Sequence, residues 1–429
     1  MQTASSDGLD RAQAIAQRAR RAATSLATTT AEQRNTALQR MAALLEDKRE
    51  EILRANRSDL DQAERDGLPR AQIGRLVFDE AKLRGRITSL IKIAALPDPI
   101  GRMERCGRMD NGLSYGRMRV PLGVLLMIYE ARPHVTVNGG AFALKSGNAI
   151  VLKGGSEAKH CTAVLAELWQ RALEVAGLPD GAVQPVRLDH DQVGHLLARP
   201  DLIDVVIPRG GKGLIRAVAE QARVPVIKHF EGNCHVYIGA RADRDTALRI
   251  ALDSKLLMPG VCNAAESLLL DASEVDWLGE LAAALGRHQI ELRGCERARQ
   301  AVAELKPATE EDFATEYLDK IYSLKVVDGV DAAVAHINRY GSGHTDAIVT
   351  ENQADARRFV AGVDSGVVLV NASTMFCDGE SLGMGAEIGI STDKLHARGP
   401  MGLEELTSYK FVLQGYGQIM GSEQPWNAS

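Results

Sequence analysis

The chain has 429 residues, 45% of them hydrophobic and 25% charged, with 40 glycines and 14 prolines. Such a composition belongs to ordinary globular proteins and excludes the fibrous and disordered classes, and the length predicts two domains rather than one core. The formal net charge is −5 and basic residues are interspersed with acidic ones, which argues against a nucleic-acid partner.

No apolar run approaches the roughly 20 residues that cross a bilayer, and the first residues lack the apolar core of a signal peptide. We therefore expect a cytoplasmic protein with no membrane partner. The six cysteines are Cys106, Cys161, Cys234, Cys262, Cys295 and Cys377. Because they are widely spread and include no CxxC pair, the sequence predicts neither disulfides nor a metal site.

The first hundred residues are predicted to be helical. Thr30 followed by Gln33 has the pattern of a capping box, which marks the start of a helix. Apolar residues then recur at helical spacing: Leu38, Met41, Leu45 and Ile52. They predict one apolar helix face, which we expect to pack on a sheet.

Residues 102–109 and 113–120 flank the turn Asp110-Asn111-Gly112. Since Asn-Gly is a strong hairpin signal, we expect a projecting β-ribbon here. From residue 124 short apolar strands alternate with helices, which is typical of an α/β fold with a parallel, doubly wound dinucleotide-binding sheet. Strands near residue 226 and at 236–238 are expected to complete that sheet.

These patterns predict three regions. The cofactor-binding domain is placed at residues 1–101 and 121–240, and an α/β catalytic domain with the nucleophile at residues 241–375. Residues 102–120 form a ribbon and residues 376–429 form a C-terminal segment. Within the latter, the extended run 407–413 can pair with a neighbouring subunit's sheet.

Two turns are candidates for binding anions. The segment from Pro208 to Gly213 follows an apolar strand and opens a helix, so free amides and the helix dipole converge there. Lys153 to Ser156 also follow a strand, and a lysine and a hydroxyl suit a ribose 2′-phosphate. Either turn also has a plain alternative interpretation, as a chain reversal or a solvated lysine.

Cys262 lies in the turn Met258-Pro259-Gly260-Val261-Cys262-Asn263, between a helix and a strand. A turn of this kind presents a reactive thiol to a cleft. Cys234 and His235 are neighbours on a predicted strand and point to opposite faces, so they are not a catalytic pair. His134 and His344 are interpreted as structural histidines.

Several segments together resemble the γ-glutamyl phosphate reductase family, also called glutamate-5-semialdehyde dehydrogenases, a branch of the aldehyde dehydrogenase superfamily. They are IYEARPHVT (128–136), LKSGNAIVLKGGSEA (144–158), DVVIPRGGKGL (204–214), GNCHVYI (232–238), PGVCNAAESLLL (259–270), YGSGHTDAIVT (340–350), VNAST (370–374) and GAEIGISTDKLHARGPMGLEELTSYK (385–410). The match runs nearly end to end and in order, which makes it specific.

The resemblance implies an aldehyde-dehydrogenase-like fold with a β-hairpin flap, and Cys262 as the catalytic thiol. For NADPH it implies Lys153 and Ser156 at the adenosine ribose, Arg209, Gly210, Gly211 and Gly213 by the pyrophosphate, and Glu316 at the nicotinamide ribose. Arg132, Asn138 and Asn263 are candidates for holding the substrate or its oxyanion. The resemblance also implies a homo-oligomer, with residues 102–120 as its oligomerisation ribbon and residues 376–429 taking part, and glutamate 5-kinase is a candidate partner.

The implied reaction converts L-glutamyl 5-phosphate, an acyl phosphate, into L-glutamate 5-semialdehyde through a Cys262 thioester, the second step of proline biosynthesis. Hydrolytic aldehyde dehydrogenases use a glutamate base and an oxyanion-binding Asn. By alignment this chain has His229 and Ala131 at those positions. Losing the water-activating base suits an acyl acceptor that is phosphate rather than water.

The chain also departs from the closer family, with Met258 and Met375 where arginine is expected, Asn138 where aspartate is expected, and Gly260 where serine is common. Methionine cannot bind a carboxylate or phosphate bidentately. Two alternatives therefore stay open: a hydrolytic aldehyde dehydrogenase acting on another semialdehyde, and a catalytically impaired NADPH-binding protein.

Overall fold

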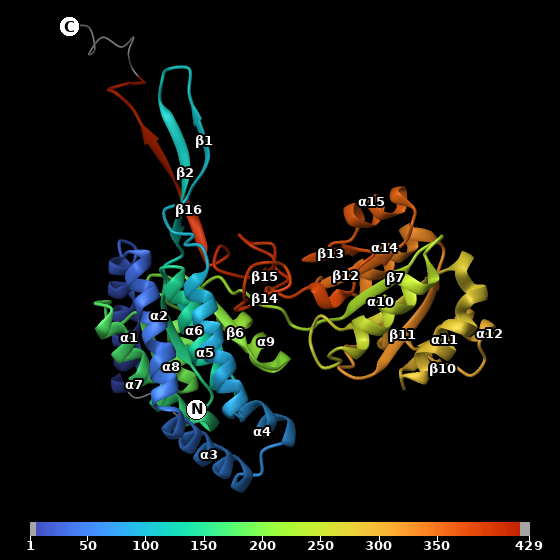
Figure 1. Cartoon of the computed structure of the whole chain (residues 1–429), viewed down its shortest axis with the longest axis horizontal. Coiled ribbons are helices and arrows are strands. Elements are labelled where there is room, and N and C mark those ends of the chain that lie inside the picture. Colours follow the sequence, from blue (N-terminus) through green and yellow to red (C-terminus); the bar gives the residue numbers. More distant parts are fainter. Residues whose placement is uncertain (1–5, 421–429) are drawn as a thin grey trace. The chain divides into compact units, whose positions relative to one another are not determined.

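The computed structural model describes residues 6–420 and contains two compact units, which we treat separately (Figure 1). The first unit takes in the described chain up to Arg209, Glu220–Val226 and the described chain from Leu403 on. The second unit consists of Gly210–Ala219 and Ile227–Gly402.

Helices make up the start of the first unit, as predicted. They are α1 (Ser6–Leu26), α2 (Ala31–Asp47), α3 (Arg49–Arg65), α4 (Arg70–Leu76) and α5 (Glu80–Ala95). The capping box is confirmed, because Thr30 Oγ1 accepts from the Gln33 amide at 3.2 Å and Gln33 Oε1 accepts from the Thr30 amide at 3.0 Å. The expected single apolar face is wrong in two respects. Ile52 belongs to α3, and α2 packs on the helices α5 and α7 rather than on a sheet.

The first unit contains a four-stranded parallel sheet in the order β5-β4-β3-β6. The strands are β3 (Val124–Tyr129), β4 (Ala149–Lys153), β5 (Val183–Val186) and β6 (Val205–Arg209). Helices α6 (His134–Lys145), α7 (Lys159–Val175) and α8 (His190–Leu197) connect them, and α9 (Lys212–Gln221) follows β6. Residue 226 forms only an isolated bridge with Val206, and the strand at 236–238 lies in the other sheet, so the predicted completion of this sheet is wrong.

Helices cover both faces of this sheet. Because successive residues of a strand point to opposite sides, neighbouring residues of one strand contact different helices. On β5, Val183 faces Gly140 of α6, while Gln184 accepts from Arg18 Nε of α1 at 2.6 Å. A Cβ on Gly140 would lie 2.6 Å from the Trp169 ring, so only glycine allows α6 and α7 to approach this closely. The layered α/β architecture predicted from the sequence is thus confirmed.

The predicted ribbon is also confirmed, as β1 (Met103–Arg108) pairs antiparallel with β2 (Ser114–Pro121) (Figure 1). The extended run expected near residues 407–413 is β16 (Thr407–Gln414). It pairs antiparallel with β2 of the same chain along its whole length, from Thr407 with Pro121 to Gln414 with Ser114. One edge of this run is therefore paired within the chain, and its pairing with a neighbouring subunit's sheet stays a prediction.

The second unit is built on a seven-stranded parallel sheet in the order β10-β9-β11-β8-β7-β12-β13. Its strands are β7 (Cys234–Ile238), β8 (Ala265–Asp271), β9 (Glu291–Gly294), β10 (Lys306–Pro307), β11 (Ile321–Val327), β12 (Thr345–Val349) and β13 (Val367–Val370). Its helices are α10 (Arg244–Leu256), α11 (Leu278–Arg287), α12 (Glu296–Ala301), α13 (Glu310–Phe313), α14 (Gly329–Tyr340) and α15 (Gln353–Gly362).

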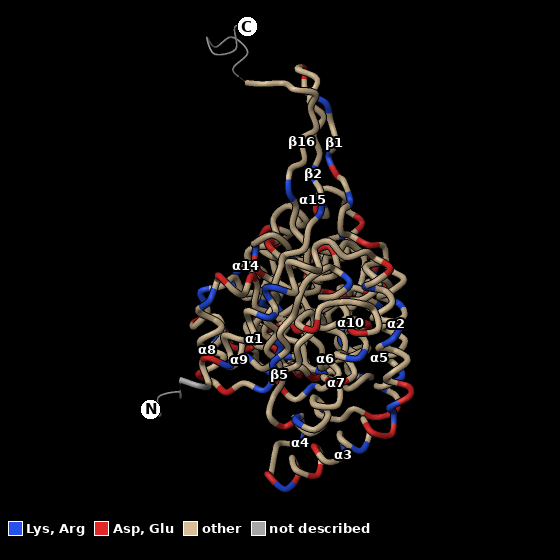
Figure 2. The backbone as a smooth tube through the Cα atoms, turned by 90° about the vertical axis from the view of Figure 1, so that its left-hand side faces the viewer, with Lys and Arg blue, Asp and Glu red and all other residues tan. Residues whose placement is uncertain are grey.

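Two apolar cores enclose this sheet. On β7, Val236 and Ile238 join the core under α10 and α11, whereas Tyr237 between them joins the core under α14 and α15. A short hairpin of β14 (Gly389–Ser391) and β15 (Gly399–Met401) completes the unit. Basic and acidic residues are interspersed along the described chain (Figure 2), and no described helix is both long and apolar enough to span a membrane.

Candidate active site

Cys262 lies, as predicted, in the turn between α10 and β8, and its side chain is half-buried. A buried ion pair braces the two ends of this turn. Lys255 Nζ of α10 donates to Glu266 Oε2 of β8 at 2.6 Å, and neither side chain is exposed. Burial is the main cause that raises the pKa of Glu266 to about 7 and lowers the pKa of Lys255. The turn therefore has fixed ends.

The backbone of Gly232 lies directly against the backbone of Cys262. A Cβ on Gly232 would be 1.7 Å from the Cys262 carbonyl oxygen, which no side chain can occupy. The Gly232 amide donates to Glu316 Oε1 at 2.7 Å, and burial raises the pKa of that carboxyl. Gly232 thus connects the nucleophile turn to Glu316, which the sequence assigned to the cofactor.

Two histidines lie beside the thiol. The Cys262 Sγ and one ring nitrogen each of His229 and His344 are all within 4.8 Å of one another, and the two imidazoles meet edge-on with centroids 5.6 Å apart. His229 Nδ1 is 3.1 Å from the Ile390 carbonyl, which can only accept, so Nδ1 carries a proton. In the neutral ring the lone pair is then on Nε2.

His344 differs from His229 in being almost fully buried, with 1% of it exposed. Burial lowers its pKa to about 3, so the ring is neutral. Its Nδ1 is 2.8 Å from Thr345 Oγ1 and 3.7 Å from Cys234 Sγ, and its Nε2 has no hydrogen-bond partner. The sequence assigned His344 a structural role only, and the structure places it beside Cys262, the candidate nucleophile.

Other thiols near Cys262 are held in the neutral form. Burial raises the pKa of Cys234 well above its usual value, and Cys234 Sγ donates to the Cys262 carbonyl at 3.2 Å. Burial also raises the pKa of Cys377 to about 12. A thiolate is the reactive form of cysteine, so neither group is suited to attack. The half-buried Cys262 is the candidate nucleophile of this cluster.

Asn263 is buried and anchors the turn. Its Nδ2 lies 3.5 Å, 3.3 Å and 3.1 Å from the carbonyl oxygens of Thr374, Met375 and Cys377. These contacts use the donor group that an oxyanion would need, so the predicted substrate role of Asn263 stays a prediction. Met375 is therefore held next to the nucleophile turn, and Met258 lies in that turn with 53% of its surface exposed.

In the first unit, predicted cofactor residues lie at the carboxyl ends of β4 and β6, the two strands on either side of β3. Lys153 ends β4 and pairs with Ile128 of β3, and Arg209 ends β6 and pairs with Tyr129. Since each strand is about 4.8 Å from the next, the two cations stand on strands about 10 Å apart. Lys153 and Arg209 are half-buried, and Ser156 in the following turn is exposed.

Ala131, predicted to replace the oxyanion-binding Asn of hydrolytic aldehyde dehydrogenases, has a left-handed backbone with φ of 38°. Its amide donates to Glu157 Oε1 at 2.5 Å, which stabilises this turn. The candidate Arg132 lies next in the chain, and Asn138 lies in α6 with a buried Oδ1 that has no hydrogen-bond partner.

After β6 comes the turn predicted to bind pyrophosphate. Gly210 is half-buried, and Gly211 and Gly213 are exposed where α9 begins. Nothing lies within 4 Å of where a Cβ on Gly213 would be, so the space beside it is open. Lys212, between these glycines, forms an ion pair with Glu231.

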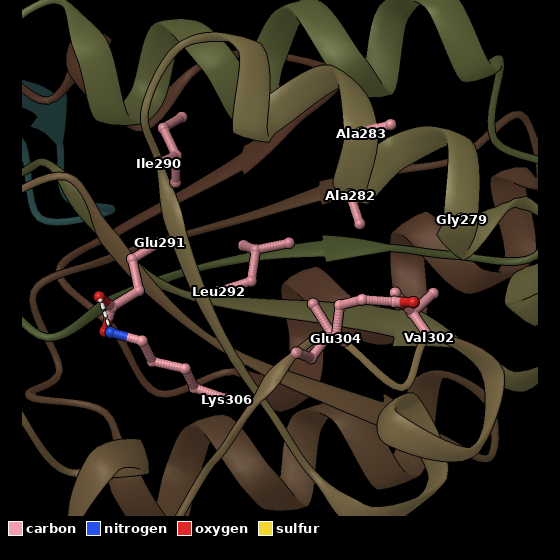
Figure 3. A pocket seen from close by; sticks show the side chains of 10 residues that line it. Gly279, Ala282, Ala283, Ile290, Glu291, Leu292, Val302, Glu304 and Lys306 are labelled. Atoms are coloured by element: carbon pink, nitrogen blue, oxygen red, sulfur yellow. Dashed lines mark hydrogen bonds and ion pairs between the residues drawn. The ribbon is translucent and has the colours of Figure 1, made fainter.

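A hollow of about 430 Å³ lies elsewhere in the second unit, at the sheet edge formed by β9 and β10 (Figure 3). It is lined by Gly279, Ala282, Ala283, Ile290, Glu291, Leu292, Val302, Glu304, Leu305 and Lys306. The Glu291 carboxylate and the Lys306 amine at its rim are paired at 2.6 Å. No candidate site residue lines this hollow, so it is distinct from the Cys262 cluster.

Comparison with known proteins agrees with the family that the sequence motifs predict. The family model described as "Aldehyde dehydrogenase family" matches residues 1–290. The chain belongs to the aldehyde dehydrogenase family. It is 50% identical over 405 residues to a gamma-glutamyl phosphate reductase of Moorella thermoacetica, an alignment that covers 94% of this chain and 97% of that protein.

Solved structures of this family agree. The gamma-glutamyl phosphate reductase of Thermotoga maritima is 40% identical with a TM-score of 0.92, covering 95% of this chain and 99% of that one. That of Saccharomyces cerevisiae is 32% identical with a TM-score of 0.53, covering 95% and 98%. An acetylating aldehyde dehydrogenase of Geobacillus thermoglucosidasius, 19% identical with a TM-score of 0.67, covers 98% of this chain and 99% of that one and shares the fold.

The predicted resemblance and fold class are thereby confirmed, as is an oxidoreductase of the aldehyde dehydrogenase family. A nicotinamide dinucleotide is the cofactor that this family implies. The residues of the chain fit such a group, because cations end the two strands that flank β3 and a glycine turn opens a helix after β6.

Two residues of this aldehyde dehydrogenase site were missed from the sequence alone. His344 was missed because no sequence spacing connects it to Cys262; the two meet only because β12, β7 and β8 are neighbours in the sheet. Gly232 lies in the motif GNCHVYI, but no role was assigned to it from the sequence. A glycine in such a motif can mark a place where a side chain would clash, and only the fold shows that the clash is with the Cys262 backbone.

Proposed function

We propose that the chain catalyses the NADPH-dependent reduction of L-glutamyl 5-phosphate to L-glutamate 5-semialdehyde and phosphate, in proline biosynthesis. The observation that carries this proposal is the Cys262 turn, a half-buried thiol with fixed ends beside an imidazole. The relatives named gamma-glutamyl phosphate reductase, at 50% and 40% identity over nearly the whole chain, support the substrate.

The first chemical step is attack of the Cys262 sulfur on the acyl carbon. A carbon–sulfur bond forms and the carbon–oxygen bond to phosphate breaks, and phosphate leaves with the bonding electrons. The thiol proton passes to the nearby imidazole of His229, whose Nδ1 donates to the Ile390 carbonyl and whose Nε2 carries the lone pair of the neutral ring. Phosphate is a good leaving group, so no strong acid is required.

The second step reduces the thioester, and the bound nicotinamide supplies the hydride for it. Charge then develops on the former carbonyl oxygen, which needs fixed donors. We assign that role to the Cys262 backbone amide, because the turn that carries it is held by Gly232, Asn263 and the Lys255–Glu266 pair. When the carbon–sulfur bond breaks, the aldehyde leaves and the thiolate is regenerated.

For the cofactor we propose NADPH rather than NADH. Lys153 at the end of β4 and Ser156 after it would contact the 2′-phosphate, and the Arg209 to Gly213 turn the pyrophosphate. Glu316, fixed by the Gly232 amide, would bind the nicotinamide ribose. Equal activity with NADH would contradict the assignment of Lys153 and Ser156. Arg132 and Asn138 remain our candidates for the substrate's polar ends.

The reaction is tested in the oxidative direction. Purified protein with glutamate 5-semialdehyde should reduce NADP only when phosphate is present. Cys262→Ala should lower this rate by at least about 10⁴-fold, because the nucleophile is lost. Cys106→Ala, which removes an exposed thiol on β1, is the matched control and should keep the rate. Phosphate-independent turnover would contradict the proposal.

A hydrolytic aldehyde dehydrogenase is the second candidate, and the structure supplies one observation for it. The imidazole of His229 beside Cys262 is a group that can activate water. The same assay separates the two, since hydrolysis proceeds without phosphate. Complete inactivity together with NADPH binding would favour the impaired enzyme, with Met258 and Met375 as the departures to examine.

We further propose that the three-stranded ribbon of β1, β2 and β16 binds a second copy of the chain. Its side chains include large exposed apolar groups, with exposed fractions of 45% for Tyr409, 64% for Phe411 and 53% for Leu413. Phe411→Lys should lower the oligomer mass in analytical ultracentrifugation; an unchanged mass would contradict this. Glutamate 5-kinase as a partner and a cytoplasmic location stay predictions.

A further inference from the structure

The amino-terminal edge of the seven-stranded sheet brings together three side chains with metal-binding atoms. The Cys262 Sγ and one ring nitrogen each of His229 and His344 are all within 4.8 Å of one another. The three residues precede β8, β7 and β12, which are neighbours in the sheet. One thiol and two imidazoles are ligands that Zn²⁺ prefers, and three protein ligands leave its fourth tetrahedral position open.

Each imidazole has a feature expected of a metal ligand. His229 donates its Nδ1 proton to the Ile390 carbonyl at 3.1 Å, and a backbone partner of this kind typically fixes the ring of a metal-binding histidine. His344 is 1% exposed, and its Nε2 has no hydrogen-bond partner. A buried polar atom without a partner is rare, so the protein leaves part of the bonding capacity of His344 unused.

The spacing is close to what a tetrahedral ion needs. Bonds of about 2.0 Å to nitrogen and 2.3 Å to sulfur place ligand atoms roughly 3.3–3.6 Å apart. Starting from separations of at most 4.8 Å, the three atoms need to close by about 1 Å to bind one ion. The carboxyl of Glu316, bound to the Gly232 amide next to Cys262, adds negative charge nearby.

We infer that His229, Cys262 and His344 form a reversible inhibitory site for a thiophilic divalent cation such as Zn²⁺. On binding, the Cys262 thiol releases its proton to water and a sulfur–metal bond forms, with no change of oxidation state. The metal occupies the sulfur lone pair that must attack the acyl carbon. Metal binding is independent of the proposed function, whereas the inhibition rests on it.

Co²⁺ is the probe for binding, because a cobalt–thiolate bond gives a charge-transfer absorption band. The untagged full chain is freed of metal with a chelator and titrated with Co²⁺. We expect one equivalent to bind with this band, and Zn²⁺ to displace it. Cys262→Ser should lose the band, and His344→Gln should weaken Co²⁺ binding at least about 10-fold.

The matched controls are Cys106→Ser and His288→Gln, which remove an exposed thiol and an exposed imidazole outside the cluster. Both should bind Co²⁺ as the unaltered chain does. The inference is overturned if the unaltered chain gives no thiolate band, if Cys262→Ser keeps it, or if His344→Gln binds with unchanged affinity.

Turnover separates the two proposals. Zn²⁺ should inhibit the phosphate-dependent reaction, and a chelator should restore it. In His344→Gln, half-inhibition relative to its own metal-free rate should need at least about 10-fold more Zn²⁺. Binding without inhibition would overturn the inhibitory role. Binding to a chain that turns over no acyl phosphate would instead overturn the proposed function and leave the metal site standing.

Discussion

The two parallel sheets carry their candidate site residues at opposite ends and in opposite environments. In the four-stranded sheet, Lys153 and Arg209 stand at the carboxyl ends of their strands, half-buried and charged, where α/β sheets usually bind ligands. In the seven-stranded sheet, Cys262 and His344 lie before the amino ends of β8 and β12, next to a buried ion pair and neutral thiols. The proposed cofactor site thus lies at accessible strand ends, and the proposed nucleophile lies in a turn whose ends are fixed by the Lys255–Glu266 pair.

The buried Lys255–Glu266 ion pair predicts a large loss of stability when one partner is removed. Lys255→Met leaves the Glu266 carboxylate buried without its partner, which should lower the free energy of unfolding by about 3–5 kcal/mol. Urea denaturation followed by circular dichroism measures this. The double variant Lys255→Met with Glu266→Leu should recover most of the loss, and a single-variant loss below about 1 kcal/mol would show that the pair is no brace.

The close backbone contact predicts the next largest effect, on catalysis. Gly232→Ala would place a methyl group 1.7 Å from the Cys262 carbonyl oxygen, so the turn must move. A displacement near 1 Å should lower kcat/KM by about 100-fold, or about 2.7 kcal/mol. Gly286→Ala in α11, with open space beside it, is the control and should keep full activity. Equal activity of both variants would contradict a fixed nucleophile.

The buried His336 in the second unit predicts that the free energy of unfolding depends on pH. Burial is the main cause that lowers the pKa of His336 to about 3, with His235, Lys325 and Arg339 adding to it. Because the folded pKa is depressed, the unfolded chain binds the proton first, and stability is lost as pH falls below about 6.5. His336→Phe should therefore gain up to about 2 kcal/mol over the unaltered chain between pH 7 and pH 5 in urea denaturation. A constant difference over this range would contradict it.

The accessible strand ends predict the smallest effect. Lys153→Ala should change the free energy of unfolding by less than about 0.5 kcal/mol, because Lys153 is half-buried and outside the core. The KM for NADPH should rise about 10-fold through loss of a charged hydrogen bond, and the KM for NADH should not. Steady-state kinetics with both cofactors measures this. An equal rise for both would remove Lys153 from the 2′-phosphate.

Local sequence patterns were enough to predict individual helices, strands and turns. They did not predict which strands pair with one another over long distances in the chain. The Thr30 capping box and the Asn111-Gly112 turn are set by neighbours in the chain, so both were predictable. The strand at 236–238 was assigned to the wrong sheet, because an apolar run does not state which strands it pairs with. Likewise Cys262 was recognisable from its turn, whereas His344 lies beside it only because β12, β7 and β8 are neighbours in the sheet.

The pairing of β16 with β2 has a consequence for synthesis of the polypeptide chain on the ribosome. The ribosome makes β16 roughly 290 residues after β2. At about 5–20 residues per second, the edge of β2 waits about 15 to 60 s for its partner strand. During that time every nascent chain on a messenger carries the same open β-edge, which is a template for pairing between chains. Synthesis of β16, rather than an earlier folding event, closes that edge.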